Sequence, residues 1–343
     1  MEAVDYYKLI YQQTFGMRHH LMDEAESLKR LEAEYEGITL EYGDYPPFIE
    51  EIGNGYTRIN LAAEAFKASM LPALNKLFIA TSRREEGTVE EFESKLEALL
   101  QLSKEDKLTV STAELKEIIE YYKKKNYPTV SHSTTYREQY HPHYRVIDAS
   151  YTVYLDVISE IIKLEKVNRP QIIAIDGRCG SGKTTFSLLI EQLFDCNVFH
   201  MDDFFLPKEL KTEERLNEPG SNVHYERVLQ EVIQPLSKGE NVQLIPFNCA
   251  VNDLEQAQAV PYKKMNFIEG VYSMHPVLEP YYDYKFFMTV DAETQIERIA
   301  ERSHAKLDKF IREWIPLEEK YFKSREIEEK ADGLIHTSFG QVK

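Results

Sequence analysis

The sequence predicts an α/β fold for the C-terminal half of the chain, a parallel sheet flanked by helices, preceded by a mostly α-helical domain. Beyond residue 165, short apolar runs alternate with amphipathic stretches, as strands and helices do in such folds. A glycine-rich segment joins the first apolar run to the first of these stretches. Before residue 150, apolar residues instead recur at helical spacing. The 343 residues therefore predict two domains, 1–150 and 151–343.

The first domain is expected to consist mainly of helices separated by glycine and proline breakers. Residues 51–58 contain two glycines and predict a turn with glycine at positive φ. Residues 127–146 are polar and aromatic, and their pattern is too irregular for a single helix. Apolar side chains at helical spacing mark residues 28–35, 92–100 and 115–122.

Along the second domain, the spacing of apolar residues alternates between that of strands and that of helices. Ligands in open parallel sheets bind at the carboxyl ends of the strands, so residues at those ends are the candidates for function. The expected strands are 172–175, 198–201, 266–268, 286–290 and 333–335, and the expected helices are 183–193, 225–236, 294–302 and 307–322.

Composition limits the classes of protein to consider. The formal net charge of -17 disfavours binding to an extended nucleic acid, although a small phosphorylated ligand needs only one loop of N–H groups and a few cations. The three cysteines, Cys179, Cys196 and Cys249, form no CxxC pair, which argues against a disulfide framework or a zinc site. The N-terminus lacks a basic segment followed by an apolar core, and no window approaches a membrane span. We expect a cytoplasmic protein with no membrane partner, and a homo-oligomer is a possible assembly.

The strongest motif is the run Gly-Arg-Cys-Gly-Ser-Gly-Lys-Thr, which matches G-x-x-x-x-G-K-[ST] between an expected strand and an expected helix. In this motif the glycines turn successive N–H groups onto phosphate oxygens, the lysine neutralises them, and the last hydroxyl can ligate Mg²⁺. A glycine-rich turn without a phosphate is the alternative. The expected nucleotide-binding residues are Gly177, Arg178, Cys179, Gly180, Ser181, Gly182, Lys183, Thr184 and Thr185.

Three further segments follow this loop in a fixed order. They are His-Met-Asp-Asp-Phe-Phe at 200–205, Phe-Ile-Glu-Gly-Val-Tyr at 267–272, and Asp291 with Arg298, Ile299 and Arg302. Together with residues 175–185, they resemble the uridine kinase, phosphoribulokinase and bacterial pantothenate kinase family. The resemblance is confined to the C-terminal half, and it implies a P-loop kinase fold that uses ATP and Mg²⁺.

The resemblance gives roles to four of these residues. It implies that Asp202 takes the proton from the acceptor hydroxyl, and an acid at the carboxyl end of a strand suits that role. It places Glu269 beside Thr184 at the metal, and Arg298 and Arg302 in a lid over the transferring phosphoryl group. Their spacing of four puts the two arginines on one helix face. The alternatives are a turn cap for Asp202, a solvated strand end for Glu269, and exposed helix arginines.

The acceptor is less well defined by the sequence. Residues 217–227 occupy the place where uridine kinases carry Asn-Phe-Asp-His-Pro, and the two do not match, so uridine or cytidine does not follow from the resemblance. His224, Tyr225 and Arg227 are candidates for the acceptor site or, alternatively, for helix packing. Asp203 is a second, weaker candidate beside Asp202.

Histidines and aromatic residues gather in two places in the first domain. His19 and His20 precede Asp23, and residues 131–145 combine three histidines with tyrosines and arginines. A metal or second substrate site is one hypothesis, and a contact with the nucleotide site is another. Aromatic packing is the simpler interpretation.

The sequence therefore predicts an ATP-dependent kinase that phosphorylates a hydroxyl of a small molecule, in the first place a nucleoside. One rival is a nucleotide-hydrolysing switch, although no N-K-x-D signature follows the loop. Another is a nucleotide-binding scaffold whose first domain binds a partner. Turnover stimulated by an acceptor separates the kinase from both.

Overall fold

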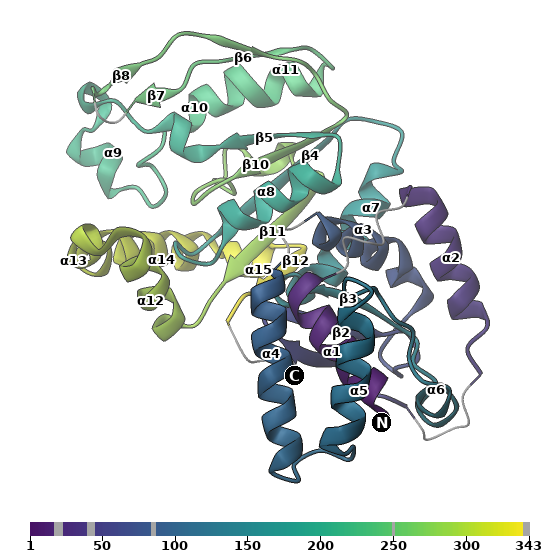
Figure 1. Cartoon of the computed structure of the whole chain (residues 1–343). Coiled ribbons are helices and arrows are strands. Elements are labelled where there is room, and N and C mark those ends of the chain that lie inside the picture. The colour runs from purple at the N-terminus through teal and green to yellow at the C-terminus, as the bar shows by residue number, and fades with distance from the viewer. Residues whose placement is uncertain (17–22, 40–44, 84–86, 249–250, 339–343) are drawn as a thin grey trace. The chain divides into compact units, whose positions relative to one another are not determined.

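The computed structural model describes residues 1–16, 23–39, 45–83, 87–248 and 251–338. The chain divides into two compact units, Met1–Ser159 and Glu160–Lys343, and the boundary falls within helix α7 (Leu155–Glu165). Figure 1 traces the chain from the helices of unit 1 to the sheet of unit 2. None of the helices in the described ranges is long and apolar enough to cross a membrane.

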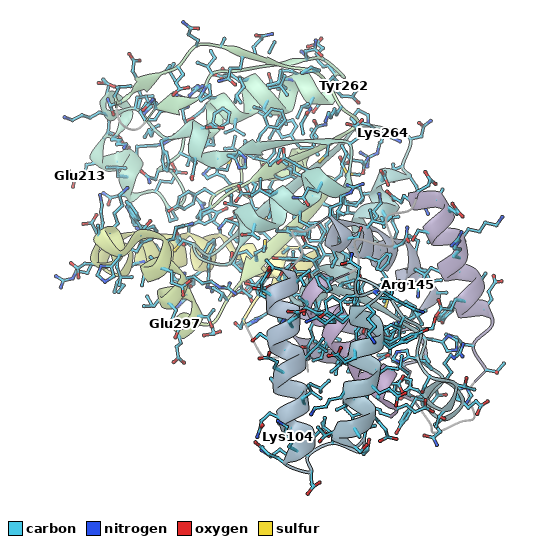
Figure 2. The ribbon with its side chains drawn as sticks, in the orientation of Figure 1. Lys104, Arg145, Glu213, Tyr262, Lys264 and Glu297 are labelled. Carbon is cyan, nitrogen blue, oxygen red and sulfur yellow. The ribbon has the colours of Figure 1, made fainter. Side chains whose placement is uncertain are left out.

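The helical core of unit 1 forms where α1 packs against α4 and α5. Tyr7, Phe92 and Leu115 are fully buried there, one from each helix. Helices α4 and α5 each begin with a capping box. Lys104, on the last turn of α4, is exposed, and its positive charge stabilises the carbonyl end of the helix (Figure 2). The helices are α1 (Ala3–Phe15), α2 (Glu24–Glu36), α3 (Leu71–Ser82), α4 (Val89–Lys104), α5 (Thr112–Lys123) and α6 (Thr134–Tyr140).

Unit 1 also contains an antiparallel sheet that the sequence did not lead us to expect. Its strands, β1 (Ile49–Gly53), β2 (Tyr56–Asn60) and β3 (Tyr144–Asp148), pair in the order β1-β2-β3. The turn between β1 and β2 has the expected glycines at positive φ, 85° at Gly53 and 74° at Gly55. All five residues of β2 are buried, so the strand lacks the alternation of polar and apolar residues that marks a half-exposed strand.

Unit 2 has a five-stranded parallel sheet in the order β12-β11-β4-β10-β5, flanked by helices, which confirms the predicted fold class. The strand that leads into the glycine-rich loop is central, with β10 on one side and β11 on the other. All its residues are buried, which explains its continuous apolar run. The strands are β4 (Gln171–Gly177), β5 (Cys196–His200), β10 (Met265–Glu269), β11 (Tyr284–Thr289) and β12 (Gly333–His336).

Three helices of unit 2 position the candidate site. Helix α8 (Lys183–Leu193) follows the loop and packs on β4, β5 and β10. Helix α12 (Ala292–Ser303) follows β11, and α14 (Ile315–Arg325) returns to the sheet, where Phe322 packs against Phe287. The helix expected at 225–236 is α10 (Tyr225–Arg227) and α11 (Gln234–Ser237), joined by a π-helical segment, Val228–Ile233.

Short antiparallel strands between α11 and β10 were also not anticipated. Strand β6 (Val242–Leu244) pairs with β9 (Gln258–Val260), and β7 (Phe247–Asn248) pairs with β8 (Asp253–Leu254). Each has only two or three residues, too few to show a period in the sequence.

Candidate active site

The glycine-rich loop lies between the end of β4 and the start of α8, and two of its glycines are required by its geometry. Gly177 has φ of 140°, and a Cβ there would lie 2.0 Å from the carbonyl oxygen of Met288. Gly182 has φ of 89° and precedes the first turn of α8. The N–H groups of that turn have no partners within the helix, so the loop ends at a natural position for an anion.

The polar side chains inside the loop fit an anionic ligand. Lys183 is 8% exposed, and its Nζ donates to the carbonyl oxygens of Gly177 (2.7 Å) and Arg178 (3.0 Å). The hydroxyl of Ser181 is buried and has no hydrogen-bond partner within the described residues. A buried cation held only by carbonyl oxygens, beside an unpaired hydroxyl, is a suitable environment for phosphate oxygens.

A buried carboxylate anchors the base of the loop. Asp176 accepts hydrogen bonds from the main-chain N–H groups of Gly177 (2.7 Å), Tyr272 (3.2 Å) and Met274 (2.9 Å), and from the hydroxyl of Tyr321 (2.9 Å). Burial raises its pKa to about 6, although these donors and the charge of Lys183 oppose that shift. Asp176 thus joins the loop to the segment after β10 and to α14.

Helix α14 makes two more contacts with the loop. Glu318 Oε2 accepts from the main-chain N–H of Cys179 at 2.9 Å. Glu319 pairs with Arg178 through two hydrogen bonds, Nε to Oε1 at 2.6 Å and Nη2 to Oε2 at 3.1 Å. Burial raises the pKa of Glu318, while the charge of Lys183 lowers it. The sequence analysis missed these carboxylates because no local motif marks them.

The predicted metal residues lie at the first turn of α8 and the end of β10. Thr184 is exposed, whereas Glu269 is buried with its Oε2 2.7 Å from Nδ1 of His200, its register partner on β5. This hydrogen bond raises the pKa of His200. In the part of the chain that the structure describes, no three His, Cys, Asp or Glu side chains form a metal cluster. A hydroxyl and one carboxylate suit Mg²⁺, which keeps several waters and binds phosphate oxygens.

Asp202 and Asp203 follow the carboxyl end of β5. Loss of hydration raises the pKa of Asp202, as does the charge of Glu269, while Lys183, His200 and Arg302 lower it. Loss of hydration and the neighbouring Asp202 also raise the pKa of Asp203, while His200 and Arg227 lower it. The structure therefore brings Asp202 into the electrostatic range of Lys183, Glu269 and Arg302.

The two arginines of α12 have different surroundings. Arg298 donates to the loop carbonyl of Gly180 (3.2 Å) and to the hydroxyl (3.0 Å) and carbonyl (2.6 Å) of Thr337. Arg302 is exposed, with its guanidinium 5.9 Å from the ring centre of Phe310. Both arginines lie on α12 as expected, but Arg298 is bonded to the loop and to Thr337, whereas Arg302 is exposed and its charge lowers the pKa of Asp202.

Of the three acceptor candidates, the structure places only His224 at a cavity. Tyr225 is buried and stacks on His275, with ring centres 3.9 Å apart. Arg227 is paired with Glu231, Nε to Oε1 at 2.6 Å. His224 helps to line a cavity of about 250 Å³ together with Leu206, Leu210, Thr212, Arg215 and Glu226.

A second cavity, of about 140 Å³, is connected to the loop through a hydrogen bond. Tyr272 lines it, and the main-chain N–H of Tyr272 is bonded to Asp176, the residue before Gly177. Ser221, 1% exposed, also lines it, and its hydroxyl has no hydrogen-bond partner among the described residues. The full lining is Leu216, Glu218, Pro219, Gly220, Ser221, Asn222, Tyr272, Leu317 and Lys320.

Two histidines of unit 1, His132 and His143, are engaged in hydrogen bonds. His132 lies between Asp5 (Nδ1 to Oδ1, 3.0 Å) and the hydroxyl of Tyr144 (Nε2, 2.6 Å), and burial lowers its pKa to about 4. His143 contacts Glu34 at 3.2 Å. His19 and His20 lie outside the described residues.

The sequence matches no protein-family model and no curated protein. Solved structures that are similar include a possible uridine kinase from Bacillus stearothermophilus, with 22% identity and a TM-score of 0.40 over 52% of this chain and 96% of that one. A candidate fructose transport system kinase from Silicibacter sp. TM1040 has 23% identity and a TM-score of 0.36 over 49% of this chain and 91% of that one. TT1252 from Thermus thermophilus has 17% identity and a TM-score of 0.32 over 49% of this chain and 89% of that one.

Proposed function

We propose that unit 2 transfers a phosphoryl group from Mg-ATP to a hydroxyl of a small, nucleoside-like molecule. The observation that supports this most directly is the position of Asp202, which follows the carboxyl end of β5, where His200 is the register partner of Glu269. Burial and the charge of Glu269 raise the pKa of Asp202, while Lys183 lowers it. A raised pKa makes a carboxylate a better proton acceptor near neutral pH. A protein that only binds nucleotide has no need of such a base, whereas a hydrolase would use it on water, so stimulation by an acceptor is what separates a kinase from a hydrolase.

The residues of the loop would hold the nucleotide phosphates. Bound Mg-ATP would supply the phosphoryl group, and its metal would neutralise the developing charge. Lys183 would exchange the carbonyl oxygens of Gly177 and Arg178 for phosphate oxygens. The hydroxyl of Thr184 and the carboxylate of Glu269 would face the metal and its waters.

The remaining groups would act on the acceptor and on the transferring group. Asp202 would accept the proton of the attacking hydroxyl, and Arg302 would stabilise negative charge on the phosphoryl oxygens. Arg298 is occupied by Gly180 and Thr337, so its role would be to fix the loop. Catalysis would then rest on positioning and electrostatics, as is usual for phosphoryl transfer.

The 140 Å³ cavity would bind the part of the acceptor that does not react. It is about the size of a cavity that holds one six-membered ring. Leu216, Pro219 and Tyr272 give it an apolar lining, and the unpaired hydroxyl of Ser221 offers a hydrogen bond. These features suit the base or the sugar of a nucleoside better than a phosphorylated group.

ADP production from Mg-ATP tests the proposal. The full chain is assayed without an acceptor, and then with nucleosides, pantothenate and phosphorylated sugars in turn. We expect one acceptor to stimulate turnover and Asp202→Asn to remove about 100-fold or more of that stimulation. Asp203→Asn is the adjacent control and should retain most of it.

Two results would contradict the proposal. ATP turnover that no acceptor stimulates would favour a hydrolytic switch. Tight nucleotide binding without turnover would favour a scaffold. Equal losses in the two aspartate variants would overturn the choice of Asp202 as the base while leaving the kinase activity itself in place.

A further inference from the structure

Helix α14 contacts three of the four residues at which β4 passes into the glycine-rich loop. The hydroxyl of Tyr321 donates to Asp176, Glu319 pairs with Arg178, and Glu318 accepts from the N–H of Cys179. The first two contacts lie outside the ring of amides that would hold a phosphate. The third contact uses a main-chain amide of the loop itself.

Glu318 therefore brings a carboxylate against the glycine-rich loop. It is only 7% exposed, its Oε2 lies 2.9 Å from the Cys179 nitrogen, and the positive charge of Lys183 acts on it. An amide and a buried ammonium group are the same donors that a nucleotide phosphate requires. A carboxylate oxygen in this position is the chemical counterpart of a phosphate oxygen.

We propose that Glu318 is an internal competitor for the phosphate loop, holding the Cys179 amide until a nucleotide phosphate displaces it. This inference rests on the proposed function of the loop as a nucleotide site. Glu318 is then a residue that sets nucleotide affinity, and it acts through the loop without touching the acceptor.

The physical reason is the repulsion between like charges in a poorly hydrated site. Two unit charges 4 Å apart interact strongly when the effective dielectric constant is about 20. A nucleotide phosphate that binds the loop must therefore either displace the Glu318 carboxylate from the Cys179 amide or lie close to its negative charge. Both cost free energy, so both weaken nucleotide binding. Without the negative charge of Glu318, the same amides and Lys183 would be available to phosphate at no such cost.

Replacing Glu318 by glutamine isolates the charge, because the amide oxygen of glutamine can still accept from Cys179. The matched control is Glu329→Gln, the same change at an exposed position on α15 (Ile327–Lys330), outside the loop and its contacts. Dissociation constants for Mg-ATP and for inorganic triphosphate are measured by titration calorimetry with the full chain. We expect Glu318→Gln to bind both ligands at least about tenfold more tightly than wild type, and Glu329→Gln to bind them within about threefold of it.

The sign of the change distinguishes competition from structural support. If Glu318 merely braces the loop, its replacement weakens binding or leaves it unchanged, and the inference is overturned while nucleotide binding by the wild type still upholds the proposed function. If neither the wild type nor any variant binds Mg-ATP or triphosphate, the proposed function itself fails. Glu318→Ala is a second variant that removes the competing oxygens altogether, and it should show the same gain.

Discussion

The hydroxyl of Tyr321 donates a hydrogen bond to Oδ2 of Asp176 across 2.9 Å, and both side chains are fully buried. The bond joins α14 to the last residue but one of β4, directly before the phosphate loop begins to turn. Asp176 accepts three main-chain N–H groups as well, so this single side-chain donor completes its hydrogen bonding.

Tyr321→Phe should destabilise unit 2 because it leaves a buried carboxylate oxygen with one donor fewer. The expected loss is about 1 to 3 kcal/mol in the free energy of unfolding, measured by urea denaturation. The pKa of Asp176, already raised to about 6 by burial, should rise further, so the loss should grow as the pH increases above 6 and the carboxylate ionises. Equal stability of variant and wild type at pH 8 would show that the bond contributes nothing.

Substitutions of the two arginines of α12 should change different kinetic constants. Arg302→Ala should lower kcat by about tenfold or more with little change in stability, since its guanidinium is exposed and its charge acts on Asp202. Arg298→Ala should raise the KM for ATP and lower the melting temperature, because it leaves Gly180 and Thr337 without their donor. Steady-state kinetics with the best acceptor and thermal denaturation test both, and identical profiles for the two variants would refute the distinction.

Ser221→Ala should weaken acceptor binding without weakening the fold. The hydroxyl is buried at the 140 Å³ cavity with no partner among the described residues, so its removal costs the folded chain no hydrogen bond. We expect the KM for the acceptor to rise about five- to tenfold, the worth of one hydrogen bond, while the KM for ATP stays constant. A change in the KM for ATP alone would place the acceptor elsewhere.

Unit 1 should lose stability on mild acidification because of His132. Its pKa is lowered to about 4 by burial from an ordinary value of 6.5, so the folded state resists a proton that the unfolded state accepts. The free energy of unfolding of unit 1 is therefore undiminished above pH 6.5. It falls by up to about 3 kcal/mol as the pH decreases from 6.5 to 4. Unfolding of wild type and His132→Asn across this range tests it, and parallel pH profiles would contradict the assignment.

The strands and the loop of unit 2 could be predicted because their signals are local. Each strand is a short, mainly apolar run, continuous only in β4, and the loop motif has a fixed spacing between Gly177 and Thr184. Burial on both faces produces such runs, and the structure has the five parallel strands in the expected places. The acid after β5 and the acid that ends β10 follow from the same rule about strand ends.

Other features could not be predicted because they depend on contacts between distant segments. Glu318 meets Cys179 across 139 residues of sequence, and only the rotation of α14 about its axis decides that Glu318 rather than a neighbour faces the loop. Strand β2 contains Arg58 and Asn60, both buried, so its composition did not indicate a strand. Tyr225 was a reasonable candidate ligand by type, but its stacking on His275 is a property of the fold alone.

One turn of α14 carries Leu317 and Lys320, which line the 140 Å³ cavity, and between them Glu318, which contacts the loop. A helix is stiff over so short a length, so a movement of α14 that withdrew Glu318 from the Cys179 amide would also move the cavity wall. Thermodynamic reciprocity then applies: any effect of one ligand on the affinity of the other must be returned in equal measure. If unit 2 acts as proposed, the affinity for ATP and the affinity for the acceptor would therefore be linked through this turn of α14.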